Sequence, residues 1–106
     1  MNPLEASDPV YSARRDDPDF VELLPMFIEE LPSMKRAMME FGKVCDFENL
    51  KREAHKLRGS AGGYGFHDLS QLAGDLEDSC KESHRDATII LRELDQLIGY
   101  IERVRV

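Results

Sequence analysis

The sequence predicts an all-α protein: an antiparallel four-helix bundle with an N-terminal arm or short extra helix. Apolar residues recur every three or four positions in four separate segments, and no segment of useful length alternates with the period of two typical of a strand. The four segments are joined by connections of a few residues, which make consecutive helices antiparallel neighbours. We expect the arm to span residues 1–17 and the bundle residues 18–106.

The arm contains Pro3 and Pro9, so we expect irregular backbone there, with at most one short helical turn around Tyr11. The first long helix is expected to begin at Asp17 and Pro18, because aspartate is a favoured N-cap and proline suits the first helical position.

This first helix has apolar residues at helical spacing from Phe20 to Phe41, and Gly42 is expected to end it. Pro25 and Pro32 fall inside it, so the helix should be kinked or locally opened. We interpret its three clustered methionines as core and core-edge residues: Met34, Met38 and Met39.

Three more helices follow. Asp46 is the expected N-cap of the second, and the glycine cluster at 62–65 is expected to end it. The third is predicted over residues 68–82 and the fourth over 85–104. The residues expected to face the core are Phe47, Leu50, Ala54, Leu57 and Ala61, then Leu69, Leu72, Ala73, Leu76 and Cys80, then Ile90, Leu94, Leu97, Ile98, Ile101 and Val104.

Length and charge exclude several classes of function. A chain of 106 residues forms one small core, too small for a two-domain enzyme that closes over a deep cleft. A net charge of −7 argues against nucleic acid as a partner, since phosphate-backbone binding needs a basic surface. No apolar run is long enough for a membrane span or a signal peptide, so we expect a cytoplasmic protein with no membrane partner. The isolated Cys45 and Cys80 are expected to be reduced and to lie in or near the core.

One stretch of the second helix does not suit a plain bundle. At about 100° per residue, His55 points roughly 120° away from the apolar stripe and therefore faces water. Gly59 follows one turn later and Gly62 one turn further, on the same outer surface. Glycine inside a helix costs about 0.5–1 kcal/mol relative to alanine. Because helical side chains lean toward the N-terminus, a side chain at position 59 would lie over His55, and Gly59 leaves the ring uncovered.

The charge around this histidine differs in sign from that of the whole chain. Residues 48–58 carry a local charge of +2, which leaves −9 for the rest. An exposed neutral imidazole with basic neighbours suits the transient attachment of a phosphoryl group. The basic residues are Lys51, Arg52, Lys56 and Arg58. Possible docking residues are Lys51, Arg52, Lys56 and Gly62, although Lys51 and Arg52 could equally be solvated and Lys56 is more simply interpreted as solvated.

On the third helix, Ser70, Gly74 and Glu77 form a stripe that can border the second helix. The Glu77 carboxylate could accept a hydrogen bond from one nitrogen of His55, fix the tautomer and leave the other nitrogen free to attack. The alternative is a plain ion pair of Glu77 with Lys81 within its own helix. Gly74 would allow the two helices to approach closely.

Residues 54–66, with His55, Arg58, Gly59, Gly62 and Gly65 at their spacing, resemble the motif of the histidine-containing phosphotransfer (HPt) domain family of multistep phosphorelays. The resemblance covers roughly residues 18–106, and it implies a four-helix fold. It implies that His55 is the phosphoryl acceptor, Arg58 the basic residue beside the phosphate, Gly59 the gap used by the docking partner and Glu77 the ring-orienting residue. Many relay members have Gln at that position, whereas Glu77 is similar to the arrangement in chemotaxis-type kinases.

The family resemblance also implies the partners: receiver domains of response regulators and a sensor or hybrid histidine kinase. It implies no cofactor on this chain, because the receiver supplies the aspartate and the Mg²⁺. Two alternatives remain from the residues alone. One is a helical adaptor that binds a receiver or kinase without carrying phosphate. The other is a metal-binding bundle using His55, Glu77 and His67, although no metal-ligand spacing supports it and His67 and His84 are interpreted as solvated.

Overall fold

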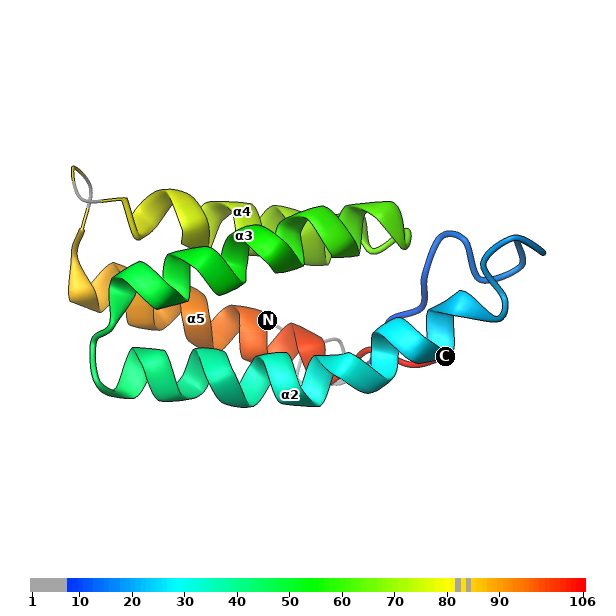
Figure 1. Ribbon diagram of the computed structural model, residues 1–106, viewed down its shortest axis with the longest axis horizontal. Coiled ribbons are helices and arrows are strands. Elements are labelled where there is room, and N and C mark those ends of the chain that lie inside the picture. The colour runs from blue at the N-terminus through cyan, green and yellow to red at the C-terminus, as the bar shows by residue number, and fades with distance from the viewer. Residues whose placement is uncertain (1–7, 82, 84) are drawn as a thin grey trace.

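Four helices pack side by side in the computed structural model, which describes residues 8–81, 83 and 85–106 (Figure 1). They are α2 (Leu23–Lys43), α3 (Phe47–Gly63), α4 (His67–Ser79) and α5 (Ala87–Ile101). Consecutive helices run in opposite directions and contact each other, and α5 also contacts α2. The predicted all-α four-helix bundle is confirmed, and the β pairing among the described residues is limited to one isolated bridge.

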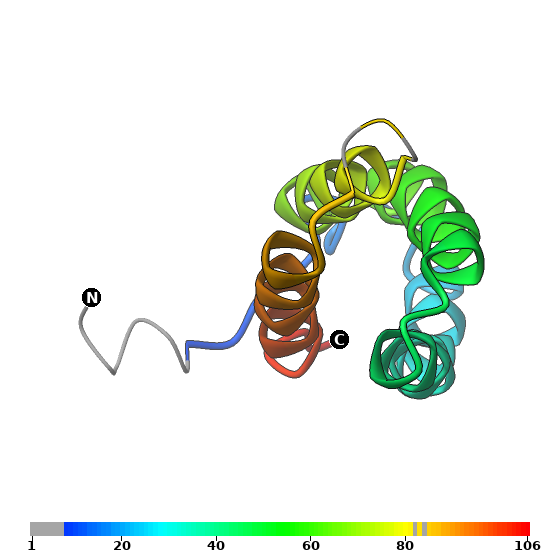
Figure 2. The ribbon, with the colours of Figure 1, turned by 90° about the vertical axis from the view of Figure 1, so that its left-hand side faces the viewer.

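The core lies where the apolar stripes of the four helices meet. The stripe predicted for α3 is buried from Leu50 to Ala61, and the stripes of α4 and α5 are buried as predicted, with Phe47, Leu72 and Ile98 only partly covered. Seen along the bundle, α3 and α4 lie together on one side, and α2 and α5 lie on the other (Figure 2). None of the helices in the described part of the chain is long and apolar enough to span a membrane.

The first helix begins later than predicted. Residues 18–22 form turns in which the carbonyl of Asp17 accepts backbone hydrogen bonds, and regular helix begins at Leu23. Pro25 therefore lies in the first turn of α2, where backbone N–H groups have no intrahelical acceptor, and it does not interrupt the helix. Pro32 lies inside α2, and the N-terminal part of the helix runs in a different direction from the C-terminal part (Figure 1).

Gly42 does not end the first helix, contrary to the prediction. The helix continues to Lys43, and Gly42 is buried against α5. A Cβ atom at Gly42 would lie 2.5 Å from Cδ2 of Leu94. This glycine therefore permits the close approach of α2 and α5, which is a packing role that sequence periodicity does not distinguish from helix termination.

The chain reverses instead at Cys45, whose φ of 56° is in the left-handed region. The N–H of Asp46 donates to the carbonyl of Phe41 at 2.8 Å, the hydrogen bond that marks a Schellman motif. Cys45 is exposed, so its predicted place in or near the core is wrong, whereas Cys80 is buried; both are free thiols. The one methionine of the cluster that is exposed is Met39, since Met38 is fully buried and Met34 partly so.

The boundaries of α3 follow the prediction closely. The side chain of Asp46 accepts a hydrogen bond from the N–H of Asn49 at 3.2 Å, which confirms Asp46 as the N-cap. At the other end the helix stops at Gly63, and Gly65 supplies a left-handed φ of +84°. The last two helices are shorter than predicted: α4 ends at Ser79, and Asp86 caps α5 from just outside.

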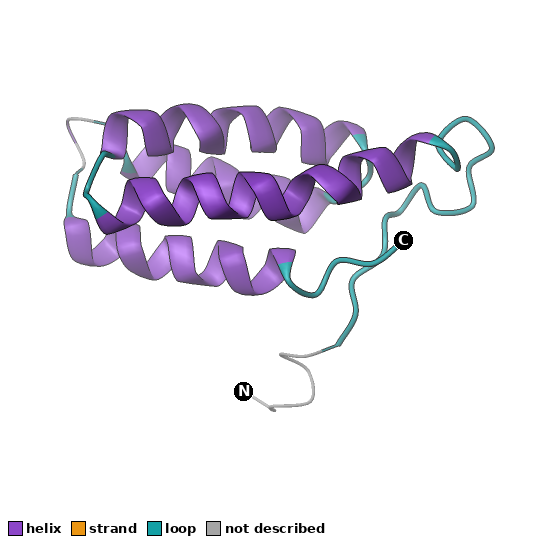
Figure 3. Ribbon diagram, turned by 60° about the horizontal axis from the view of Figure 1, so that its bottom comes forward, coloured by secondary structure: helices purple, strands orange, loops and turns teal. Residues whose placement is uncertain are grey.

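The described part of the arm lies beside the C-terminal end of the chain (Figure 3), and hydrogen bonds hold it to that end and to the turn after α3. The N–H of Val10 donates to the carbonyl of Arg103 at 2.8 Å, and Val10 bridges to Val104. The hydroxyl of the buried Ser12 donates to the carbonyl of Tyr64. The backbone at Tyr11 is not helical and residues 13–16 form turns, while residues 1–7 of the predicted arm lie outside the described residues.

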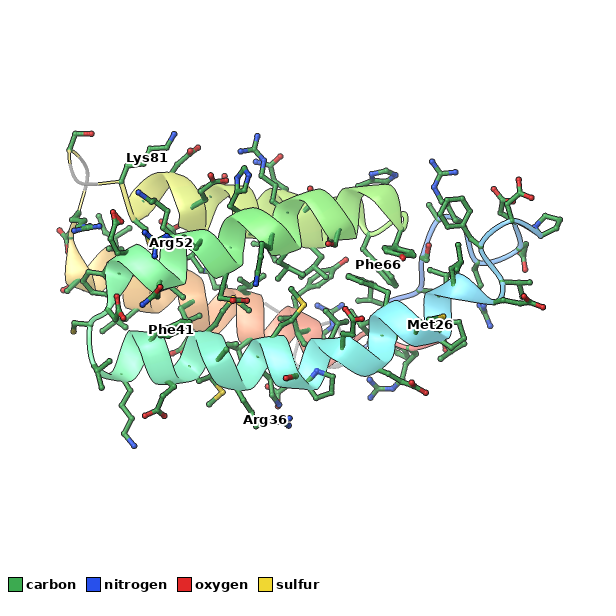
Figure 4. All side chains as sticks on the ribbon, viewed as in Figure 1. Met26, Arg36, Phe41, Arg52, Phe66 and Lys81 are labelled. Atoms are coloured by element: carbon green, nitrogen blue, oxygen red, sulfur yellow. The ribbon has the colours of Figure 1, made fainter. Side chains whose placement is uncertain are left out.

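Aromatic rings fix the turn that follows α3. Tyr64 stacks on Phe27 of α2 with ring centroids 4.7 Å apart, and Phe20 meets Tyr64 edge to face. Phe66 also contacts Phe27 and lies between this turn and α2 (Figure 4). Such aromatic pairs contribute about 0.5–1.5 kcal/mol each beyond the area they bury. They hold the C-terminal end of α3, and so the helix that carries His55, against α2.

Candidate functional site

His55 lies on the outward face of α3, and 71% of its side chain is exposed. It is exposed because Ala54 and Leu57, which are buried in the core, lie on the opposite side of the helix. Gly59 follows one turn later, and a Cβ atom built there would meet no other atom within 4 Å. The ring is therefore open to solvent on the side that a residue at position 59 would otherwise cover.

The ring of His55 is held from one side by α4. Its Nδ1 lies 2.8 Å from Oε2 of Glu77, whose side chain is only 14% exposed. An ionised carboxylate only accepts hydrogen bonds, so Nδ1 of the ring carries the proton and donates it to Glu77. Nε2 is then the nitrogen with a free lone pair, and among the described residues it has no hydrogen-bond partner.

The same carboxylate also binds Arg58, which lies one turn after His55. Nη1 of Arg58 donates to Oε1 of Glu77 at 3.2 Å, so each oxygen of Glu77 has its own partner on α3. A Cβ atom on Gly74 would lie 3.3 Å from Nε of Arg58, so the missing side chain leaves room for the guanidinium along α4. Sequence reasoning paired Glu77 with the histidine and missed this second ion pair.

The stripe predicted on α4 does border α3. The hydroxyl of Ser70 donates to the carbonyl of Arg58 at 2.8 Å, in the part of α3 where Gly59 and Ser60 follow. Gly62 lies against the same serine, because a Cβ atom there would be 3.3 Å from Oγ of Ser70. Gly62 is therefore part of the contact between α3 and α4, and not of the free outer surface on which the sequence placed it.

Three of the four predicted docking residues, all except Gly62, line a shallow pocket beside the histidine. The pocket has a volume of about 390 Å³, and its lining residues are Lys51, Arg52, His55, Lys56 and Glu77. Arg52 hydrogen-bonds Asn49 within α3, and Figure 4 shows where it leaves the helix. The long aliphatic stems of these cations form much of the wall, so the pocket combines apolar surface with a basic rim.

Carboxylates moderate the positive charge of this surface. Lys51 pairs with Glu48 at 3.1 Å, and Lys56 pairs with Glu53 at 2.9 Å, each three residues apart. The hydrogen bond from Lys51 holds the pKa of the Glu48 carboxyl below its usual value. With Glu77 brought in from α4, the site is less basic than the sequence of residues 48–58 alone suggests.

The model of the Hpt domain family matches residues 22–106, which is most of the chain. The chain belongs to the Hpt domain family. Hpt domains take part in phosphotransfer in two-component signalling, and they interact with receiver domains and kinases. Searches of the curated proteins and of the solved structures gave no significant match.

Other side chains considered from the sequence lie outside the site of this Hpt domain. Lys81 pairs with Asp78 at 2.9 Å, so the alternative pairing of Glu77 with Lys81 does not occur. His67 is exposed at the start of α4, while His84 lies outside the described residues. Within the described part of the chain, no three His, Cys, Asp or Glu side chains gather closely enough to hold a metal ion.

Proposed function

We propose that this Hpt domain carries a phosphoryl group on Nε2 of His55, between aspartates of receiver domains or from a kinase to a receiver. The observation that carries the proposal is the hydrogen bond of Nδ1 to Glu77, since it selects the tautomer of the neutral ring in which the exposed Nε2 has the lone pair. We infer that the protein acts in the cytoplasm, where such receivers and kinase domains operate.

The transfer step needs only a nucleophile from this chain. The lone pair of Nε2 attacks the phosphorus of the aspartyl phosphate, the N–P bond forms, and the P–O bond to the aspartate breaks. The electron pair of that bond leaves with the aspartate as a free carboxylate, and no proton has to move. The proton on Nδ1 stays in its hydrogen bond, so the phosphorylated ring is cationic. The carboxylate of Glu77, 2.8 Å from Nδ1, stabilises that positive charge.

Arg58 and Gly59 support this step in different ways. The guanidinium of Arg58 is bound to Glu77 in the unphosphorylated protein, and it lies close enough to His55 to reorient toward the incoming phosphoryl oxygens. Gly59 leaves space for the edge of the receiver that holds the aspartate and the Mg²⁺. The chain itself is proposed to bind no cofactor.

The pocket beside His55 is the proposed contact for the receiver. Its basic rim of Lys51, Arg52 and Lys56 can meet acidic groups around the receiver's aspartate, while their aliphatic stems give apolar contact. The rest of the chain is acidic, so it repels the acidic groups around the receiver's aspartate. The receiver is therefore attracted only to the face with the basic rim.

The test mixes the purified chain with phosphorylated receiver domains from the same cell and follows labelled phosphate. We expect phosphate on the chain that is lost in acid, and none in His55→Gln. His67→Gln is the matched control, because it removes an exposed histidine from a neighbouring helix. Labelling that persists in His55→Gln refutes the assignment. Binding of a receiver without any transfer to the native chain favours a helical adaptor instead.

A further inference from the structure

The bundle has a second open surface, which the proposed phosphotransfer does not use. It lies along the contact between α2 and α5, on the opposite side from the pair α3 and α4 that holds His55 (Figure 2). We call this surface the α2–α5 seam and define it by the residues that line its two grooves.

Both grooves of the seam are lined by apolar side chains together with charged ones. One has a volume of about 320 Å³ between Met39 on α2 and Leu91 and Ile98 on α5. The other has a volume of about 300 Å³ and lies further along, between Pro32 on α2 and Ile101 on α5. Met39 is 49% exposed and Leu91 is 38% exposed, and the two side chains line the same groove. Apolar side chains that gather in a groove with a charged rim are typical of a surface that binds another molecule.

The charges along the seam separate by helix. The cations that line its grooves from α2 are Lys35 and Lys43, and the carboxylates on the opposite side are Asp95 of α5 and Glu102, the C-cap of that helix. The single exception on the α5 side is Arg105, which lies beyond the end of that helix and hydrogen-bonds the carbonyl of Glu102. Lys35 pairs with Glu102 at 3.7 Å across the seam.

Lys43 and Asp95 border the same groove, and both are exposed. Neither forms an ion pair with another residue of the described part of the chain. The groove therefore has a basic rim on α2 and an acidic rim on α5. A partner that places an acidic group opposite α2 and a basic group opposite α5 would complement both rims.

We propose that the seam binds a second copy of this chain, in a dimer whose two-fold axis runs parallel to the helices. Such an axis places α2 of one copy over α5 of the other, so that Lys43 faces Asp95 of the second copy and the Met39 and Leu91 side chains cover each other. An axis perpendicular to the helices would place α2 on α2 and bring lysine against lysine. The separation of charge thus selects the parallel axis.

The contact is small. A helix of 15 residues is about 22 Å long, and two adjacent helices present a face about 20 Å wide. The dimer would therefore bury roughly 900 Å² in total, which is below the range of about 1,200–2,000 Å² of stable specific interfaces and within that of weak, transient ones. The dimer should form reversibly as protein concentration rises, and it leaves His55 of both copies open to receivers, because the site lies on α3 and α4.

The test measures the dimer dissociation constant of the full chain by sedimentation equilibrium. We expect Lys43→Glu and Asp95→Lys each to raise that constant by about tenfold or more, because the two-fold axis uses each repulsive contact twice. Mixing the two variants should restore association as a heterodimer, since both of its cross-contacts are then attractive. Lys81→Glu makes the same charge change at the far end of α4 and should have no effect (Figure 4).

Three results overturn the proposal: a native chain that stays monomeric up to about 1 mM, single variants that dimerise as tightly as the native chain, and a mixture that associates no better than its components. Phosphotransfer to His55 should be unchanged in both variants. A failure of dimerisation is therefore separate from a failure of the proposed phosphocarrier function.

Discussion

Replacing Gly59 should make the protein more stable, and a large side chain at this position should also make it less active. This glycine lies inside α3, is exposed, and has no other atom within 4 Å of the position of a Cβ. Alanine at such a site gains about 0.5–1 kcal/mol in the free energy of unfolding. In a domain of this size that corresponds to a rise in melting temperature of about 2–8 °C. Leucine has nearly the same helix propensity, so Gly59→Leu should be stabilised by a similar amount.

The two substitutions should differ in phosphotransfer. A methyl group at position 59 reaches little of His55, whereas a leucine side chain leans back over the ring and blocks the approach of a receiver. We expect Gly59→Ala to transfer phosphate at a rate close to that of the native chain. Gly59→Leu should be slower by about 100-fold, the size of loss that a small misplacement of reacting groups causes.

Gly99 provides a matched control for this experiment. It lies inside α5, is exposed, and likewise has no other atom within 4 Å of a built Cβ. Gly99→Leu should therefore gain the same stability and transfer phosphate at the native rate. The assay is single-turnover transfer from a phosphorylated receiver, alongside thermal unfolding. Native transfer rates in Gly59→Leu, or an equal loss in both leucine variants, would refute the argument that Gly59 keeps the ring accessible.

Four further predictions concern the fold. Gly42→Ala should lower the free energy of unfolding by about 1–3 kcal/mol, because its Cβ would lie 2.5 Å from Leu94 in a packed contact. An unchanged denaturant midpoint would contradict this. Cys45→Gly should stabilise the protein by about 1 kcal/mol, because it relieves a left-handed backbone at a residue with a side chain, and a loss of stability would count against it. Ser12→Ala should lower the free energy of unfolding by about 1–3 kcal/mol, because the carbonyl of Tyr64 and the N–H of Arg14 lose their buried partner. An unchanged free energy of unfolding would show that these hydrogen bonds do not stabilise the fold. Burial raises the pKa of the Cys80 thiol to about 11. In the folded protein at pH 8, a thiol reagent should therefore modify the exposed Cys45 quickly and Cys80 only on unfolding. Modification of both thiols at the same rate would contradict this.

The helices could be predicted because the relevant signals are local. The spacing of Leu50, Ala54, Leu57 and Ala61 places one face of α3 in the core, and Asp46 caps that helix through a side chain three residues from its partner. The contact of Glu77 with His55 could also be predicted, because helical spacing places Glu77 on a side of α4 that can border α3 and the family resemblance implies a ring-orienting residue at this position.

The remaining features depend on contacts between distant parts of the chain. Gly42 looks like a helix terminator until Leu94 is known to lie against it. Nothing near Ser12 in the sequence indicates that its hydroxyl binds the carbonyl of Tyr64. The bond of Arg58 to Glu77 depends on the spacing of two packed helices, for which the glycine at position 74 was the only local signal.

The most direct test of the central claim is to locate the phosphoryl group on the ring. The chain, labelled with ¹⁵N at histidine, is phosphorylated by a receiver and examined by ¹⁵N and ³¹P nuclear magnetic resonance. Because Nδ1 of His55 is held by Glu77, the phosphorus should couple to Nε2 of His55, and Nδ1 should keep its proton. Phosphorus bound to Nδ1, to another histidine or to no nitrogen at all would contradict the account.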